Sequence, residues 1–193
     1  MIYWGRGISK HARLELETII ARLRLEWMAP FHVDARPRLS SYRGKIESAT
    51  GRGFEIHAAS DMRRRRMLLD SDLIGHPAEL RRIFTHELFH FIWIRMGNST
   101  RRRYEEMLSA EIRKGARGEL GWSAEWRKEA LAAADLRRRT RRWREYACES
   151  FCDTGAWLNS RSGRHGEFTL AKRWRARRWA WFQEAIDGSP QPV

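Results

Sequence analysis

Cysteine is scarce in this sequence of 193 residues, which contains only Cys148 and Cys152. On a helix, a spacing of four residues holds two thiols in a poor geometry for a disulfide. The chain therefore differs from the small proteins that disulfides hold together. Two small packing residues are the simplest interpretation of the pair, and a reactive or metal-binding pair is the alternative.

Long apolar runs are also absent. The longest one extends from Leu88 to Ile94 and is interrupted by His90, whereas a membrane span needs about 20 apolar residues. The first residues, MIYWGRGISKH, lack the apolar centre and the small-residue cleavage site of a secretory signal. These absences predict a soluble, cytoplasmic protein without a membrane partner.

Acidic residues are few: the sequence has 24 of them against 38 basic residues, which gives a net charge of +14 at pH 7. Most of the excess is arginine, and it gathers at residues 63–66, 101–103, 137–144 and 173–178. Such clusters attract polyanions, and phosphate contacts made by them would depend strongly on salt. The alternative is that these arginines only cover solvated faces.

The length and an apolar content of 42% predict one domain over residues 1–193. Apolar residues at helical spacing predict a helix from residue 9 to about 28, capped by Ser9. Short β-favouring segments divided by Gly and Pro follow over 31–60, with another near 63–73. The predicted class is α+β, a mainly helical domain with a small twisted sheet before the next helix.

That next helix is well delimited by its sequence. Pro77 suits the first helical position, Glu79 the first turn, and Gly97 a left-handed residue after the last turn. Helical patterns then continue to the end of the chain, over residues 104–114, 123–158 and 168–186.

The segment FTHELFHFIWI, residues 84–94, lies inside this helix and contains the pattern His-Glu-x-x-His. His86 and His90 are one turn apart on the same face, so both imidazoles can reach one ion, and Glu87 projects beside them. An ionised Glu87 in so apolar a helix is costly unless something compensates its charge. The spacing therefore predicts a zinc site.

A catalytic zinc usually has three protein ligands and one open position, so a third ligand is needed. The later segment WREYACESFCDTGAWL places Glu145, Glu149 and Asp153 at intervals of four residues. On a helix they form one acidic face among otherwise mostly apolar or small residues.

His86, Glu87 and His90, followed by a later Glu-x-x-x-Asp, resemble the gluzincin branch of the zinc metallopeptidases. The resemblance covers these two helices and implies a zincin-like domain that binds Zn²⁺. It implies His86, His90 and Glu149 as ligands, Glu87 as the general base, and Asp153 as the partner that holds a ligand histidine.

Two alternatives for the third ligand stay open. Glu145 and Glu149 form a competing Glu-x-x-x-Glu pair in which Glu145 would be the ligand, although only Glu149 has an aspartate four residues later. A thiolate of Cys148 or Cys152 is the other alternative and would suit a structural metal site better.

No residue is clearly marked as the group that stabilises the transition state. Tyr146 and His165 are candidates by residue type only. The remaining histidines, among them His57, show no ligand spacing.

Three functions are consistent with these residues. The first is zinc-dependent hydrolysis of a peptide or protein substrate, with Glu87 as the base, a strand near Met67 to Asp70 as an edge for the substrate, and arginines that favour acidic substrates. The second is non-specific nucleic-acid binding by arginine clusters interrupted by Trp143 and Trp174, with a structural metal. The third is a zincin-like scaffold that has lost activity or serves as a regulator, although the intact Glu87 argues against the loss of activity. Nothing in the sequence indicates an oligomeric state.

Overall fold

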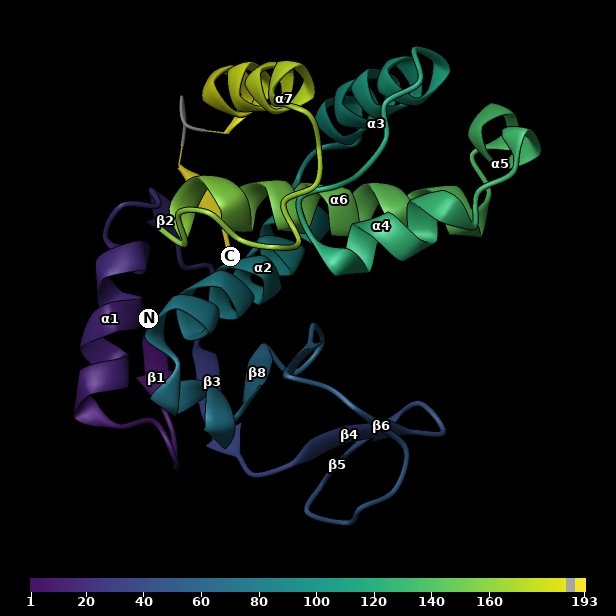
Figure 1. Cartoon of the computed structure of the whole chain (residues 1–193). Coiled ribbons are helices and arrows are strands. Elements are labelled where there is room, and N and C mark those ends of the chain that lie inside the picture. The colour runs from purple at the N-terminus through teal and green to yellow at the C-terminus, as the bar shows by residue number, and fades with distance from the viewer. Residues whose placement is uncertain (187–189) are drawn as a thin grey trace.

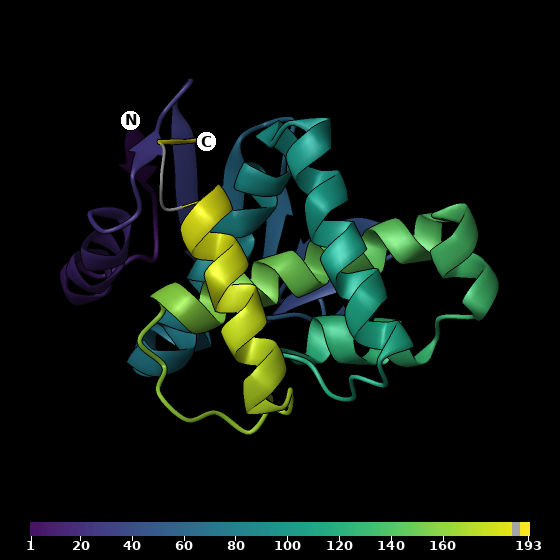
Figure 2. The same ribbon diagram turned by 90° about the horizontal axis from the view of Figure 1, so that it is seen from above.

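The computed structural model describes residues 1–186 and 190–193. It has the α+β architecture that the sequence predicts, with a main sheet of mixed strand direction and helices stacked in layers over it (Figure 1). Helix α2 (Pro77–Arg95) lies next to the sheet, and α6 (Arg141–Asn159) lies over α2 (Figure 1). Helices α3 (Asn98–Arg113) and α7 (Lys172–Ala185) form the outer layer (Figure 1). Viewed from above, α3 and α7 run side by side across α6 (Figure 2).

The main sheet contains four strands in the order β1-β3-β8-β7. They are β1 (Ile2–Trp4), β3 (Phe31–Arg36), β8 (Arg66–Asp70) and β7 (Ala58–Asp61). The first three are parallel, and β7 is antiparallel to β8. The expected edge at Met67 to Asp70 is wrong, because β8 is hydrogen-bonded on both sides and β7 forms the edge.

Two smaller sheets accompany the main one. The outer sheet, in the order β5-β4-β6, is antiparallel and comprises Lys45–Ser48, Leu39–Tyr42 and Phe54–Glu55. The other pairs β2 (Leu25–Glu26) with β9 (Gln191–Pro192), which ties the end of the chain to the segment after the first helix.

Helix α1 (Lys10–Ile20) begins where the sequence predicts, since the Ser9 side chain accepts a hydrogen bond from the amide of Ala12. It ends earlier than residue 28, because residues 25 and 26 pair with the end of the chain as β2. That pairing joins segments more than 160 residues apart, so no local pattern indicates it.

Helix α2 (Pro77–Arg95) has the predicted start, with Pro77 in the first turn. The prediction for Gly97 is wrong: its φ of −58° is not left-handed, and the residue is the N-cap of α3 (Asn98–Arg113). The predicted segment 123–158 divides into α4 (Trp122–Glu129), α5 (Ala133–Arg138) and α6 (Arg141–Asn159), and the last helix is α7 (Lys172–Ala185).

The core forms where the sheet, α2 and α6 meet. Strand β3 buries alternate residues, as a period of two requires, whereas α2 is buried around much of its circumference because it lies between two layers. Among the described residues, no helix combines the length and apolar composition that a membrane span needs.

Candidate metal centre

Two histidines of α2 converge at one point. The Nε2 atoms of His86 and His90 lie 3.1 Å apart, and the two side chains are only 12% and 17% exposed. The helix places them there because residues four apart share one face. Two imidazole nitrogens therefore point to the same small volume.

Helix α6 adds a carboxylate to this pair. The Oε2 atom of Glu149 lies 3.3 Å from Nε2 of His86 and 3.9 Å from Nε2 of His90. Donor atoms around a tetrahedral zinc, at bond lengths of about 2.0 to 2.1 Å, are roughly 3.3 Å apart. The three side chains thus fit a single ion of this size, and together they form a group that could hold a metal.

Asp153, one turn further along α6, contacts the other nitrogen of His86. Its Oδ1 lies 2.7 Å from Nδ1, while its Oδ2 accepts a hydrogen bond of 3.1 Å from the amide of Ala124. A carboxylate on Nδ1 keeps the proton there and leaves Nε2 as a lone-pair donor. Asp153 therefore orients His86 so that Nε2 faces His90 and Glu149, as a metal site would require.

Glu145, the competing ligand, lies apart from this group. Its side chain is 46% exposed and forms an ion pair of 2.6 Å with Arg141. Both acids are on one face of α6, but only the turn that carries Glu149 lies against the two histidines. The geometry therefore favours Glu149 over Glu145 as the carboxylate that joins the two histidines.

The charged side chains of this group shift one another's pKa values. Burial acts to lower the pKa of His86, but the Asp153 and Glu149 carboxylates outweigh it and hold the pKa well above its usual value. Burial would raise the pKa of Glu149, yet the hydrogen bond with His86 and the nearby charges of His90 and Arg127 lower it to about 2. Positive charge is therefore favoured where the imidazole nitrogens meet.

The cysteines form a second, overlapping group with His90. Cys148 Sγ lies 3.4 Å from Nδ1 of His90, and His90, Cys148 and Cys152 could also hold an ion. The hydrogen bond with Cys152 contributes most to a lowered Cys148 pKa of about 6, whereas burial raises that of Cys152. Because Cys148 faces Nδ1, it can support His90 on the side away from His86.

Glu87 lies beside the group and faces a cavity of about 520 Å³. Its Oε2 accepts a hydrogen bond of 2.6 Å from Oγ of Ser60, which is on the edge strand β7. The cavity is also lined by His57, Arg82 and Trp122. The sequence did not indicate that Ser60, His57 and Arg82 lie near Glu87. The His-Glu-x-x-His pattern lies within one helix, so it carries no information about which residues of other elements pack around that helix.

Tyr146 and His165, the candidates by residue type alone for stabilising a transition state, are not among the residues that line this cavity. Tyr146 is fully buried and donates a hydrogen bond of 2.7 Å to Glu119. Nε2 of His165 instead lies 2.8 Å from Oε1 of Glu79.

The tryptophans within the arginine clusters are not available for base stacking. Trp143 is 1% exposed and Trp174 is 8% exposed. Arg178, in the last cluster, is fully buried and bonded to Glu111 and Glu119. The combination of charge and open aromatic faces that the nucleic-acid hypothesis needs is therefore missing at these positions.

Comparisons of the chain with protein-family models, with curated proteins and with solved structures give no match.

Proposed function

We propose that the protein is a zinc-dependent peptidase, with His86, His90 and Glu149 as the metal ligands and Glu87 as the general base. The observation that carries this proposal is the convergence of three ligand atoms from α2 and α6 next to a cavity that also contains Glu87. Two histidines and one carboxylate are a ligand set that catalytic zinc uses in hydrolases.

Zinc, when bound, polarises a peptide carbonyl and lowers the pKa of a water molecule. Glu87 takes a proton from the attacking water and transfers it to the leaving amine. Ser60 holds Oε2 of Glu87 and leaves Oε1 for this transfer. Asp153 keeps His86 in the ligand tautomer.

The edge strand β7 supports a peptide as the substrate. One side of β7 is paired with β8, and in the described part of the chain no strand pairs with its other side. Ser60 of β7 contacts Glu87, so this edge borders the base. An extended peptide can add to such an edge through main-chain hydrogen bonds, which brings its carbonyl groups past the catalytic residues.

The cavity does not support the expected preference for acidic substrates. Its charged lining residues are mostly carboxylates, Glu55, Glu87, Asp153 and Glu167, with Arg82 as the only arginine among those lining it. Arg82 is already paired with Glu79 and Glu167. No residue of the four arginine clusters is among the described residues that line this cavity, so the cavity is better suited to neutral or basic side chains.

Metal analysis of purified variants tests the ligand set. We expect about one zinc per chain in the unmodified protein, and loss of stoichiometric zinc in His86→Ala, His90→Ala and Glu149→Ala. The matched control, Glu145→Ala, removes an exposed carboxylate from the same helix and should keep its metal. A zinc-loaded Glu149→Ala beside a metal-free Glu145→Ala would contradict the proposed ligand.

Gly121→Ala should weaken zinc binding without changing any ligand. A Cβ atom at Gly121 would lie 2.2 to 2.5 Å from the carboxylate atoms of Asp153, so Asp153 must move away from His86. Loss of such a partner typically costs about 10- to 100-fold in metal affinity, measurable by competition with a chromophoric chelator. Gly166→Ala, with nothing within 4 Å of its Cβ position, is the control. Equal affinities in the two variants would show that Asp153 does not position His86.

A further inference from the structure

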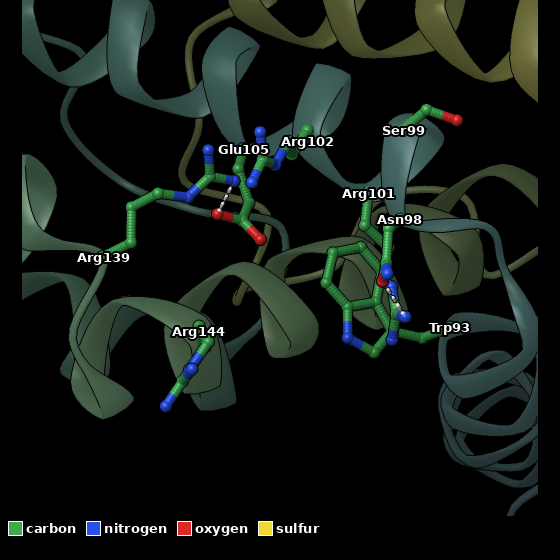
Figure 3. Close-up of a pocket in the computed structure, with 8 residues that line it drawn as sticks. All are labelled: Trp93, Asn98, Ser99, Arg101, Arg102, Glu105, Arg139 and Arg144. Atoms are coloured by element: carbon green, nitrogen blue, oxygen red, sulfur yellow. Dashed lines mark hydrogen bonds and ion pairs between the residues drawn. The ribbon is translucent and has the colours of Figure 1, made fainter.

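A second cavity, of about 720 Å³, lies apart from the metal centre. It forms where the end of α2 meets the beginnings of α3 and α6 and the segment after α5. Figure 3 shows four arginines around it, Arg101, Arg102, Arg139 and Arg144. A volume of this size is typical of a site for a small molecule.

The lining has an uncompensated positive charge. Four arginines against a single carboxylate, Glu105, leave a net charge of +3. Glu105 is already occupied, because it pairs with Arg139 (Figure 3) and accepts a hydrogen bond of 2.9 Å from Nε1 of Trp143. Among the described residues, Arg102 and Arg144 have no carboxylate within ion-pair distance.

The first turn of α3 adds hydrogen-bond donors to this charge. No side chain caps the helix, whose N-cap is Gly97. Asn98, which lines the cavity, instead accepts a hydrogen bond of 2.6 Å from Arg101 (Figure 3). The first amides of any helix lack intrahelical acceptors, and Asn98 and Ser99 in the first turn of this 16-residue helix line the same cavity as the arginines.

We propose that this cavity is a binding site for a small molecule that carries phosphate groups, held by Arg101, Arg102 and Arg144 and by the first amides of α3. Guanidinium groups match phosphate oxygens in pairs of parallel hydrogen bonds. Helix amides complete such an anion site.

A nucleic-acid strand fits this cavity less well. The aromatic side chain that lines it, Trp93, is only 7% exposed, and Trp143 behind Glu105 is 1% exposed. Neither presents a face on which a base could stack, so phosphate recognition without base stacking is what the lining offers.

Isothermal titration calorimetry of the full chain with pyrophosphate, at constant ionic strength, tests the site. We expect one saturable site in the unmodified protein, with affinity reduced about tenfold or more in the double variant Arg102→Gln, Arg144→Gln, since each change removes a charge-assisted contact. The matched control, Arg36→Gln with Arg52→Gln, removes the same charge from exposed positions on other elements and should change affinity by less than about twofold. Circular dichroism checks folding, and Arg144→Gln alone provides the test if the double variant does not fold.

Titrations with inorganic phosphate and with a nucleoside diphosphate distinguish the sources of the phosphate group. Tighter binding of either one, with the same loss in the double variant, supports the site and names the source. Equal losses of pyrophosphate affinity in the double variant and in the control would overturn the proposal. They would show that pyrophosphate is attracted by the positive charge of the whole surface and not by this cavity. It would also be overturned by the absence of saturable pyrophosphate binding at millimolar concentration, or by an oligonucleotide that binds and that pyrophosphate does not displace.

Discussion

Glu87→Gln should retain zinc and lose hydrolysis. The amide keeps the size of the side chain and can still bond to Ser60, but it cannot take a proton from water. General-base catalysis typically contributes about 10²- to 10⁴-fold, so the rate on an unfolded protein substrate, followed by mass spectrometry of the peptides, should fall by that factor. Zinc content should be unchanged, because Glu87 is not among the three converging ligands.

Glu145→Gln is the matched control for this prediction, since it makes the same chemical change at an exposed carboxylate. It should leave both zinc content and rate unchanged. Hydrolysis that survives in Glu87→Gln would remove Glu87 from the role of base. A zinc-loaded, unmodified protein that cleaves no peptide bond would favour the inactive scaffold.

Arg178→Met should strongly destabilise the helical layers. Arg178 is fully buried and bonds to Glu111 at 2.9 Å, Glu119 at 2.6 Å and the Ser150 hydroxyl at 3.0 Å. Methionine fills the space but leaves two buried carboxylates with less compensation. Breaking a buried ion pair in this way costs about 3 to 5 kcal/mol, which urea unfolding would measure.

Two comparisons separate the effect of the uncompensated buried charge on stability from the effect of lost packing. Arg177→Met, at a neighbouring arginine with no ion pair among the described residues, should change the free energy of unfolding by less than about 0.5 kcal/mol. Adding Glu111→Gln to Arg178→Met should recover part of the loss, because one uncompensated charge is removed. No recovery would indicate that packing rather than charge dominates.

The same network predicts a pH dependence. Burial would raise the pKa of Glu119, but Arg178 and Lys128 lower it to about 2, from an ordinary value of 4.5. A depressed folded-state pKa stabilises the protein above pH 4.5, and this contribution is lost as the pH falls toward 2. The free energy of unfolding of the unmodified protein should therefore fall as the pH drops from about 4.5 toward 2, which urea unfolding at a series of pH values would measure.

The sequence by itself determined the features that depend on neighbours within one element. The start of α2 at Pro77 and the cap of α1 at Ser9 follow from local chemistry. The convergence of His86 and His90 also follows, because helical geometry fixes side chains four residues apart. These interactions form within a turn or two of chain, so a local pattern suffices to predict them.

Only the tertiary structure decided which acid faces the histidines. Glu145 and Glu149 are equivalent within α6, and the difference arises because the turn with Glu149 packs against α2 while Glu145 is left exposed to pair with Arg141. The contact between Ser60 and Glu87 likewise depends on β7 being the edge of the sheet. Both contacts depend on packing between elements that are distant in sequence. The energy of this packing is shared among many side chains, so no single element carries a periodic pattern that would predict it.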